Sequence, residues 1–192
     1  MNDIKKVNKQ EAARRQLDAA IEWYFEGGDL LPIYNIASSV FVMTENLAKK
    51  DNIEHTFYGV MGSELNNDEL KNLKIEMGRK HGFLKHGDRD TPEIIDVNEK
   101  QAAAILYYAS ENYTHLFKEQ SSQMALIKAF VYSYFGREIG IEEEYMKQIE
   151  RFELIAKQEG ITRLKEIIGQ QLKNYKKLNN GSDRSVHKIK AA

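Results

Sequence analysis

The stretch LPIYNIASSVFVMTENLAKK, residues 31–50, has the clearest structural pattern in the chain. Its inward positions recur three and four residues apart, as they do on one face of an α-helix. Asp29 offers an N-cap, Pro32 suits a first turn, and Asp51-Asn52 ends the pattern. The stretch therefore predicts an amphipathic helix that packs on a core through one face. The face comprises Ile33, Ile36, Ala37, Val40, Phe41, Thr44 and Leu47.

The same periodicity continues on both sides of this stretch. Asn66 with Glu69, and Asn98 with Gln101, resemble capping boxes that begin two further helices. No segment has the convincing alternation that is typical of a strand. We predict an all-α fold, a single-domain bundle of about six or seven helices. The expected helices are 11–26, 31–50, 68–80, 98–118, 121–137, 142–159 and 161–178, while 53–62 fits either a short helix or an ordered loop.

Composition bounds the possible chemistry. The chain has 192 residues, 28 basic and 29 acidic side chains, and no cysteine. Disulfides, thiolate metal sites and cysteine nucleophiles are therefore excluded, and the balanced charge does not indicate a polyanionic partner. We predict a single helical domain over residues 1–178 and a flexible polar tail over 179–192, which begins Asn-Asn-Gly-Ser.

The N-terminal segment predicts a cytoplasmic protein. Residues 1–10 are polar and basic and lack the apolar core of a secretion signal. No apolar run approaches the roughly 18 residues that a membrane span needs, so we expect no membrane contact. The basic residues near this end are interpreted as solvated charge rather than as a nucleic-acid contact; they are Lys5, Lys6, Lys9, Arg14 and Arg15.

The segment HGFLKHGDRD, residues 81–90, concentrates ionisable side chains more than any other part of the sequence. One interpretation is structural, with the acidic side chains capping helices or pairing with neighbouring cations, and with Phe83 and Leu84 anchoring the segment. A second is that the segment binds a partner. Its candidate binding residues are His81, Lys85, Asp88, Arg89 and Asp90.

A catalytic interpretation uses Arg79 and His86, which are separated by six residues. This spacing in an all-helical setting resembles the arginine–histidine motif of HEPN-domain proteins, which are small helical bundles. The resemblance implies metal-independent RNA cleavage. His86 would transfer a proton to or from a reacting oxygen, and Arg79 would neutralise charge developing on the phosphate.

A metal site is the remaining interpretation. His86, Asp88 and Asp90 alternate along the segment and could offer one nitrogen and two oxygens, with His81 as a fourth ligand. Alternating loop residues do not reliably converge, and no second ligand cluster supports an ion. We therefore predict no metal and no cofactor.

The string FLKHGDRD, residues 83–90, is similar to the signature of a family of uncharacterised bacterial helical proteins. Residues 12–21 and 25–29 resemble the amphipathic N-terminal pair of that family, so the resemblance covers roughly the first half of the chain. It implies no particular activity. Our hypothesis is a helical interaction or regulatory protein of the bacterial cytosol, which acts through an unknown protein partner or self-association. The alternative is a HEPN-like ribonuclease or toxin-type protein, the one hypothesis in which RNA is a partner.

Overall fold

The computed structural model describes residues 6–53, 57, 66–85, 94–135, 143–178 and 186–188. Within these ranges the chain forms seven long helices in a single bundle, which confirms the predicted all-α fold class. The helices are α1 (Lys9–Phe25), α2 (Leu30–Lys50), α4 (Asn67–Lys85), α5 (Glu99–Phe117), α6 (Ser122–Phe135), α7 (Glu143–Glu159) and α8 (Ile161–Leu178).

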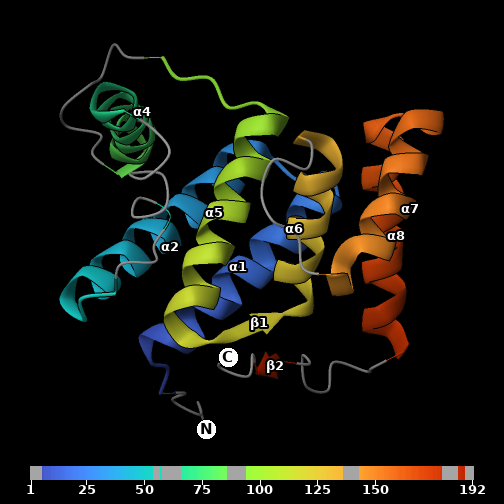
Figure 1. Cartoon of the computed structure of the whole chain (residues 1–192), viewed down its shortest axis with the longest axis horizontal. Helices are drawn as coiled ribbons and strands as arrows, with labels where there is room; N and C mark the ends of the chain where they lie inside the picture. The colour runs from blue at the N-terminus through green and yellow to red at the C-terminus, as the bar shows by residue number, and fades with distance from the viewer. Residues whose placement is uncertain are drawn as a thin grey trace, which may run out of the picture.

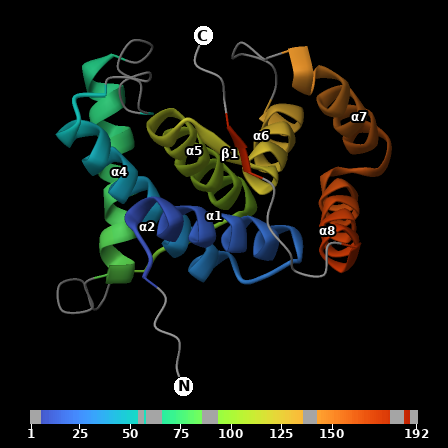
Figure 2. The same cartoon turned by 90° about the horizontal axis from the view of Figure 1, so that it is seen from below.

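The helices surround a central pair, α5 and α6 (Figures 1 and 2). α1 packs against both helices of this pair and α2 packs against α5, while α4 lies along the outer side of α2 at one end of the molecule. α7 and α8 form the opposite end, with α7 packed against α6 and α8 against α1. Two peripheral units are thus attached to a common core from opposite sides.

The predicted capping residues are confirmed. Asn98 and Gln101 form a reciprocal capping box at the start of α5. Asn66 and Glu69 exchange the same pair of hydrogen bonds, at 3.0 Å each, before α4. The Asp29 carboxylate accepts a 2.9 Å hydrogen bond from a backbone N–H in the first turn of α2. Because these bonds satisfy donors that no helical carbonyl reaches, they fix where each helix begins.

The predicted end of α4 near Lys80 was wrong, because the helix continues through Gly82 to Lys85. A Cβ atom added at Gly78 or at Gly82 would meet nothing within 4 Å. These glycines are therefore not required by a close packing contact. Each lowers helix propensity by about 1 kcal/mol relative to alanine, a cost that does not interrupt the helix.

The expectation that the chain has no strand was also wrong. β1 (Glu119–Ser121) pairs antiparallel with β2 (Val186–Lys188), with Gln120 opposite His187 (Figure 1). Lys118 ends α5 in a left-handed conformation, at φ 54°, and the chain leaves the helix in extended form. The tail predicted to be flexible over 179–192 is therefore paired at 186–188, by backbone hydrogen bonds that need no apolar pattern.

Among the described side chains, those of every helix except α4 supply the fully buried core. Tyr24, Phe25 and Phe130 pack edge to face, with ring centroids 5.3 to 5.9 Å apart. This geometry is favoured by the aromatic quadrupole, and it joins α1 to α6. The largest fully buried side chains are Leu17, Ile21, Tyr24, Ile33, Phe41, Leu106, Tyr113, Met124, Ile127, Phe130, Ile149 and Leu164.

No helix in the described ranges is both long and apolar enough to cross a bilayer.

Candidate functional site

An open groove of about 570 Å³ lies between α2 and α4, and we call it the α2–α4 groove. Most of its lining comes from the side of α2 that does not face the core. α1 contributes one lysine at the edge, and α4 contributes one histidine. The lining residues are Lys9, Asn35, Ser39, Val42, Met43, Asn46, Leu47, Lys50 and His81.

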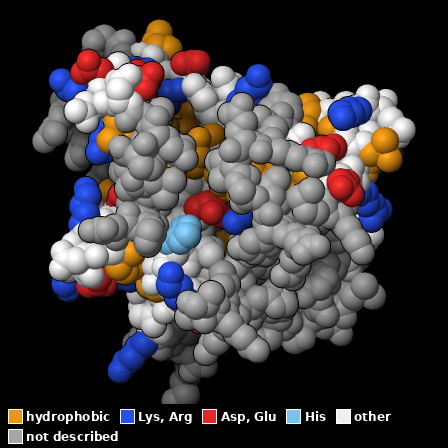
Figure 3. Space-filling view, viewed as in Figure 1, with side chains coloured by type: hydrophobic (Ala, Val, Ile, Leu, Met, Phe, Trp, Pro, Cys, Tyr) orange, Lys and Arg blue, Asp and Glu red, His pale blue; other side chains and the backbone are white. Residues whose placement is uncertain are grey.

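The lining combines basic and aliphatic side chains. Lys9, Lys50 and His81 supply the basic groups, and none of the nine lining residues carries a carboxylate. Elsewhere the charges are mixed: the face in Figure 3 shows Lys and Arg interspersed with Asp and Glu in its coloured parts. Among the described lining residues the charges are all basic, which favours an anionic ligand.

His81 is oriented by Ser38, a buried residue of α2. The Ser38 Oγ lies 3.1 Å from the backbone carbonyl oxygen of Asn35 and 3.2 Å from His81 Nδ1. A hydroxyl has one proton, which Ser38 donates either to the Asn35 carbonyl or to His81 Nδ1, depending on the histidine tautomer. This contact holds the imidazole at the boundary between α2 and α4.

His81 also lines a smaller cavity of about 160 Å³ on the inner side of the groove, together with Glu45 and Met77. Glu45 is buried, and it accepts a 2.8 Å hydrogen bond from Asn112 Nδ2. The Oδ1 of Asn112 in turn accepts the backbone N–H of Phe57 at 2.7 Å. His81 thus lies between an open, basic groove and an interior carboxylate that is fixed by α5.

Two further residues lie on the inner side of α4. Lys80 is buried and donates from Nζ to the backbone carbonyl of Asp96 at 2.9 Å, which ties α4 to the segment before α5. Tyr34 of α2 is also buried, and this desolvation, together with the nearby Glu76 carboxylate, raises the pKa of its hydroxyl to about 12. The Lys80 bond therefore anchors α4, and Tyr34 marks the buried boundary between α2 and α4.

The predicted site residues fall into separate groups. His81 lines the groove, whereas Arg79, two positions earlier on α4, pairs with Glu76 at 3.5 Å and is partly exposed. Lys85 is the last residue of α4. His86, Asp88, Arg89 and Asp90 lie outside the described residues. The arginine–histidine pair and the segment's ligand candidates therefore remain predictions.

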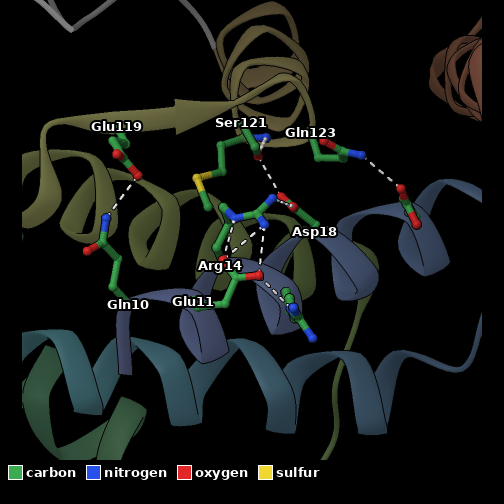
Figure 4. A network of polar contacts seen from close by, with 10 residues as sticks. Gln10, Glu11, Arg14, Asp18, Glu119, Ser121 and Gln123 are labelled. Atoms are coloured by element: carbon green, nitrogen blue, oxygen red, sulfur yellow. Dashed lines mark hydrogen bonds and ion pairs between the residues drawn. The ribbon is translucent and has the colours of Figure 1, made fainter. Parts of the chain in front are cut away.

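A buried polar network that the sequence analysis did not identify joins α1 to the start of α6 (Figure 4). Asp18 is fully buried; it accepts from Ser121 Oγ at 2.5 Å and lies 3.5 Å from an Arg14 nitrogen. One turn later, Glu22 accepts from Gln123 Nε2 at 2.8 Å. Because hydrogen-bond donors engage both carboxylates, we assign the network a structural role.

The described ranges contain no group of three or more His, Asp or Glu side chains placed to hold an ion. The helices and the groove define an all-α protein with a basic, partly aliphatic groove along one of its helices. Comparisons with protein-family models, with curated proteins and with solved structures found no match.

Proposed function

We propose that the protein is a helical interaction protein that binds an acidic, amphipathic segment of a partner protein in the α2–α4 groove. The observation that carries the proposal is the composition of the described lining. It joins three basic side chains, Lys9, Lys50 and His81, to three apolar ones, Val42, Met43 and Leu47, and these described residues include no carboxylate. Acidic side chains of a partner would meet the cations, and its apolar side chains would cover the aliphatic residues.

The spacing along α2 favours a helical partner. Asn35, Ser39, Val42 and Asn46 follow one another at intervals of four, three and four residues, so they form a stripe along one face. From Asn35 to Lys50 the stripe extends about 22 Å at 1.5 Å per residue. A partner helix with apolar side chains at i, i+4 and i+7 matches this period and covers about half of this length.

The same lining argues against single-stranded RNA as the occupant of this groove. RNA-binding grooves stack bases on aromatic rings, and the nine lining residues include no aromatic side chain. They include Met43, whose flexible thioether adapts to varied apolar partners. A protein segment therefore accounts for the lining better than a nucleic acid does.

Fluorescence anisotropy tests this proposal with a labelled synthetic helix that has leucine at i, i+4 and i+7 and glutamate on its flanks. The wild-type protein should bind it, with an affinity that falls as salt is added. Val42→Asp and Lys50→Glu should each weaken binding by roughly tenfold. Lys173→Glu, at an exposed position of α8, is the charge-matched control and should leave binding unchanged. Equal binding by all variants, or stronger binding of oligouridine, would overturn the proposal.

A HEPN-like ribonuclease is the second candidate. It is favoured by the continuity of α4, which extends as one helix from Arg79 through Gly82 to the residue before His86. Positions seven apart share a face of a continuous helix, so a helix that includes His86 would bring both groups together. In this case RNA cleavage should persist with a chelator and disappear in Arg79→Ala and His86→Ala. No cleavage by the folded wild-type protein would reject it.

A further inference from the structure

A second cavity, of about 340 Å³, lies where the C-terminal end of α1 meets the start of α8 and of α5. Its apolar part is formed by Tyr24, Phe25 and Phe130, the three rings that pack edge to face in the core. This end of the molecule is opposite to α4 (Figure 2), so the cavity is separate from the α2–α4 groove. Its size is within the range of small-molecule sites.

Lys165 of α8 crosses this cavity and is largely buried. Its Nζ lies 4.1 Å from the centroid of the Tyr24 ring and 2.8 Å from both carboxylate oxygens of Glu99. The Tyr24 hydroxyl donates to the backbone carbonyl of Glu99 at 3.5 Å, which helps hold the ring and the carboxylate together. An aromatic face beside a carboxylate is a recognised arrangement for binding an ammonium group. The chain thus fills an ammonium-binding position with its own lysine.

Gly169 explains how the lysine reaches this position. A Cβ atom at Gly169 would lie 2.3 Å from the backbone oxygen of Phe25, so only glycine permits the observed approach of α8 to α1. Lys165 is one helical turn before Gly169 and therefore projects from the same face. The close approach at Gly169 sets the distance at which Lys165 covers Tyr24.

The charges around the cavity favour a cation. Glu26, Glu99 and Glu166 line it, and the described lining residues supply one ammonium, that of Lys165. Glu166 also pairs with Arg163 at 2.9 Å, whereas Glu99 contacts the ammonium that lies over the Tyr24 ring. An anionic ligand would be repelled by these carboxylates. A neutral ligand that displaced Lys165 would leave the Glu99 carboxylate without a cationic partner.

We propose that this cavity binds a small organic primary amine with an aromatic body. The ammonium of the ligand takes the position of Lys165 Nζ over Tyr24 and beside Glu99, and its aromatic body packs against the Phe25 and Phe130 side of the cavity. Lys165 acts as an internal competitor, which moves outward when the ligand binds. The binding needs no other component and is independent of the partner site between α2 and α4.

Because Lys165 competes with the ligand, removing its ammonium should strengthen ligand binding. With 2-phenylethylamine as the probe, calorimetric titration at pH 7 should detect binding to the wild-type protein. Lys165→Met keeps the apolar stem and removes the competing ammonium, so it should tighten binding by about five- to tenfold. Glu99→Gln should weaken binding by a similar factor. Lys173→Met, at an exposed position on α8, is the matched control and should not change the affinity.

Two uncharged or anionic analogues test the proposal on the wild-type protein alone. 2-Phenylethanol and phenylacetate keep the ring and replace the ammonium with a hydroxyl or a carboxylate, and both should bind at least tenfold more weakly than the amine. Equal binding of the three compounds, no detectable binding of the amine, or weaker binding by a folded Lys165→Met variant would overturn the proposal.

Discussion

Ser38 Oγ lies 3.2 Å from His81 Nδ1, and this contact joins the two helices that form the α2–α4 groove. The Ser38 hydroxyl is also 3.1 Å from the Asn35 carbonyl, and its single proton is donated either to that carbonyl or to His81 Nδ1. The direction of the Ser38–His81 hydrogen bond therefore depends on which ring nitrogen of His81 carries the proton.

This contact predicts a loss of stability when it is removed. Ser38→Ala deletes the hydroxyl that His81 Nδ1 contacts at 3.2 Å, so the protein should lose about 1 kcal/mol of stability, and the ¹⁵N resonances of the His81 ring should shift. Urea denaturation and NMR spectra of both proteins measure the two effects. An unchanged stability together with unchanged His81 ring resonances would contradict the contact.

The glycines predict opposite effects of one substitution. Gly169→Ala should destabilise the protein by about 1–3 kcal/mol, because its Cβ would lie 2.3 Å from the Phe25 carbonyl oxygen and α8 would have to shift. Gly82→Ala in α4 is the matched control. It meets no neighbour within 4 Å and should stabilise by about 0.5–1 kcal/mol. Urea denaturation measures both; a destabilising Gly82→Ala would contradict the continuity of α4.

The buried network predicts that replacing Asp18 strongly lowers the free energy of unfolding. Asp18→Ala leaves Arg14 and Ser121 without their buried acceptor, and it should lower the free energy of unfolding by about 3 kcal/mol. Glu150→Ala, an exposed position on α7, should change it by less than about 0.5 kcal/mol. Chemical denaturation distinguishes the two. Equal, small effects would show that the network contributes little.

Tyr34 predicts a loss of stability at high pH. Its folded-state pKa is raised to about 12 by burial and by Glu76, above the ordinary value of 10.0. The neutral hydroxyl is favoured in the folded state, so this stabilisation is complete below pH 10 and is lost as the pH rises from 10 through 12. Tyr34→Phe should make the unfolding free energy fall less steeply over that window. Denaturation curves at pH 9, 10 and 11 measure the slope.

Much of the fold could be predicted because its signals are local. The capping pairs Asn66–Glu69 and Asn98–Gln101 lie three residues apart, and the stripe over 31–50 repeats within one helix. The pairing of β1 with β2 could not be predicted, because it joins segments far apart in the chain through backbone groups. The effect of Gly82 was predicted wrongly, since the helix was expected to end before it. The low helix propensity of one glycine is a small free-energy cost, which the rest of α4 outweighs.

The candidate site was predictable only in part. His81 stood out as part of a segment dense in ionisable groups, whereas its partner Ser38 is 43 residues away. Most of the groove is lined by residues of α2 outside its predicted core-facing stripe, positions that a sequence pattern assigns to solvent; Leu47 alone of the named lining residues belongs to that stripe. Asp18 carried one usable signal: it lies next to Leu17 and three residues before Ile21, which are both buried. A carboxylate in such a position has to be paired if it is buried too.

The most direct test of the proposed function is to map the leucine–glutamate helix by NMR on the isotope-labelled protein. The largest chemical-shift changes on binding should fall on Val42, Met43, Asn46 and His81. They should disappear in Val42→Asp, while the spectrum remains that of a folded protein. Shifts concentrated on α7 and α8, or no shifts at peptide concentrations that saturate the anisotropy signal, would contradict the assignment of the α2–α4 groove as the partner site.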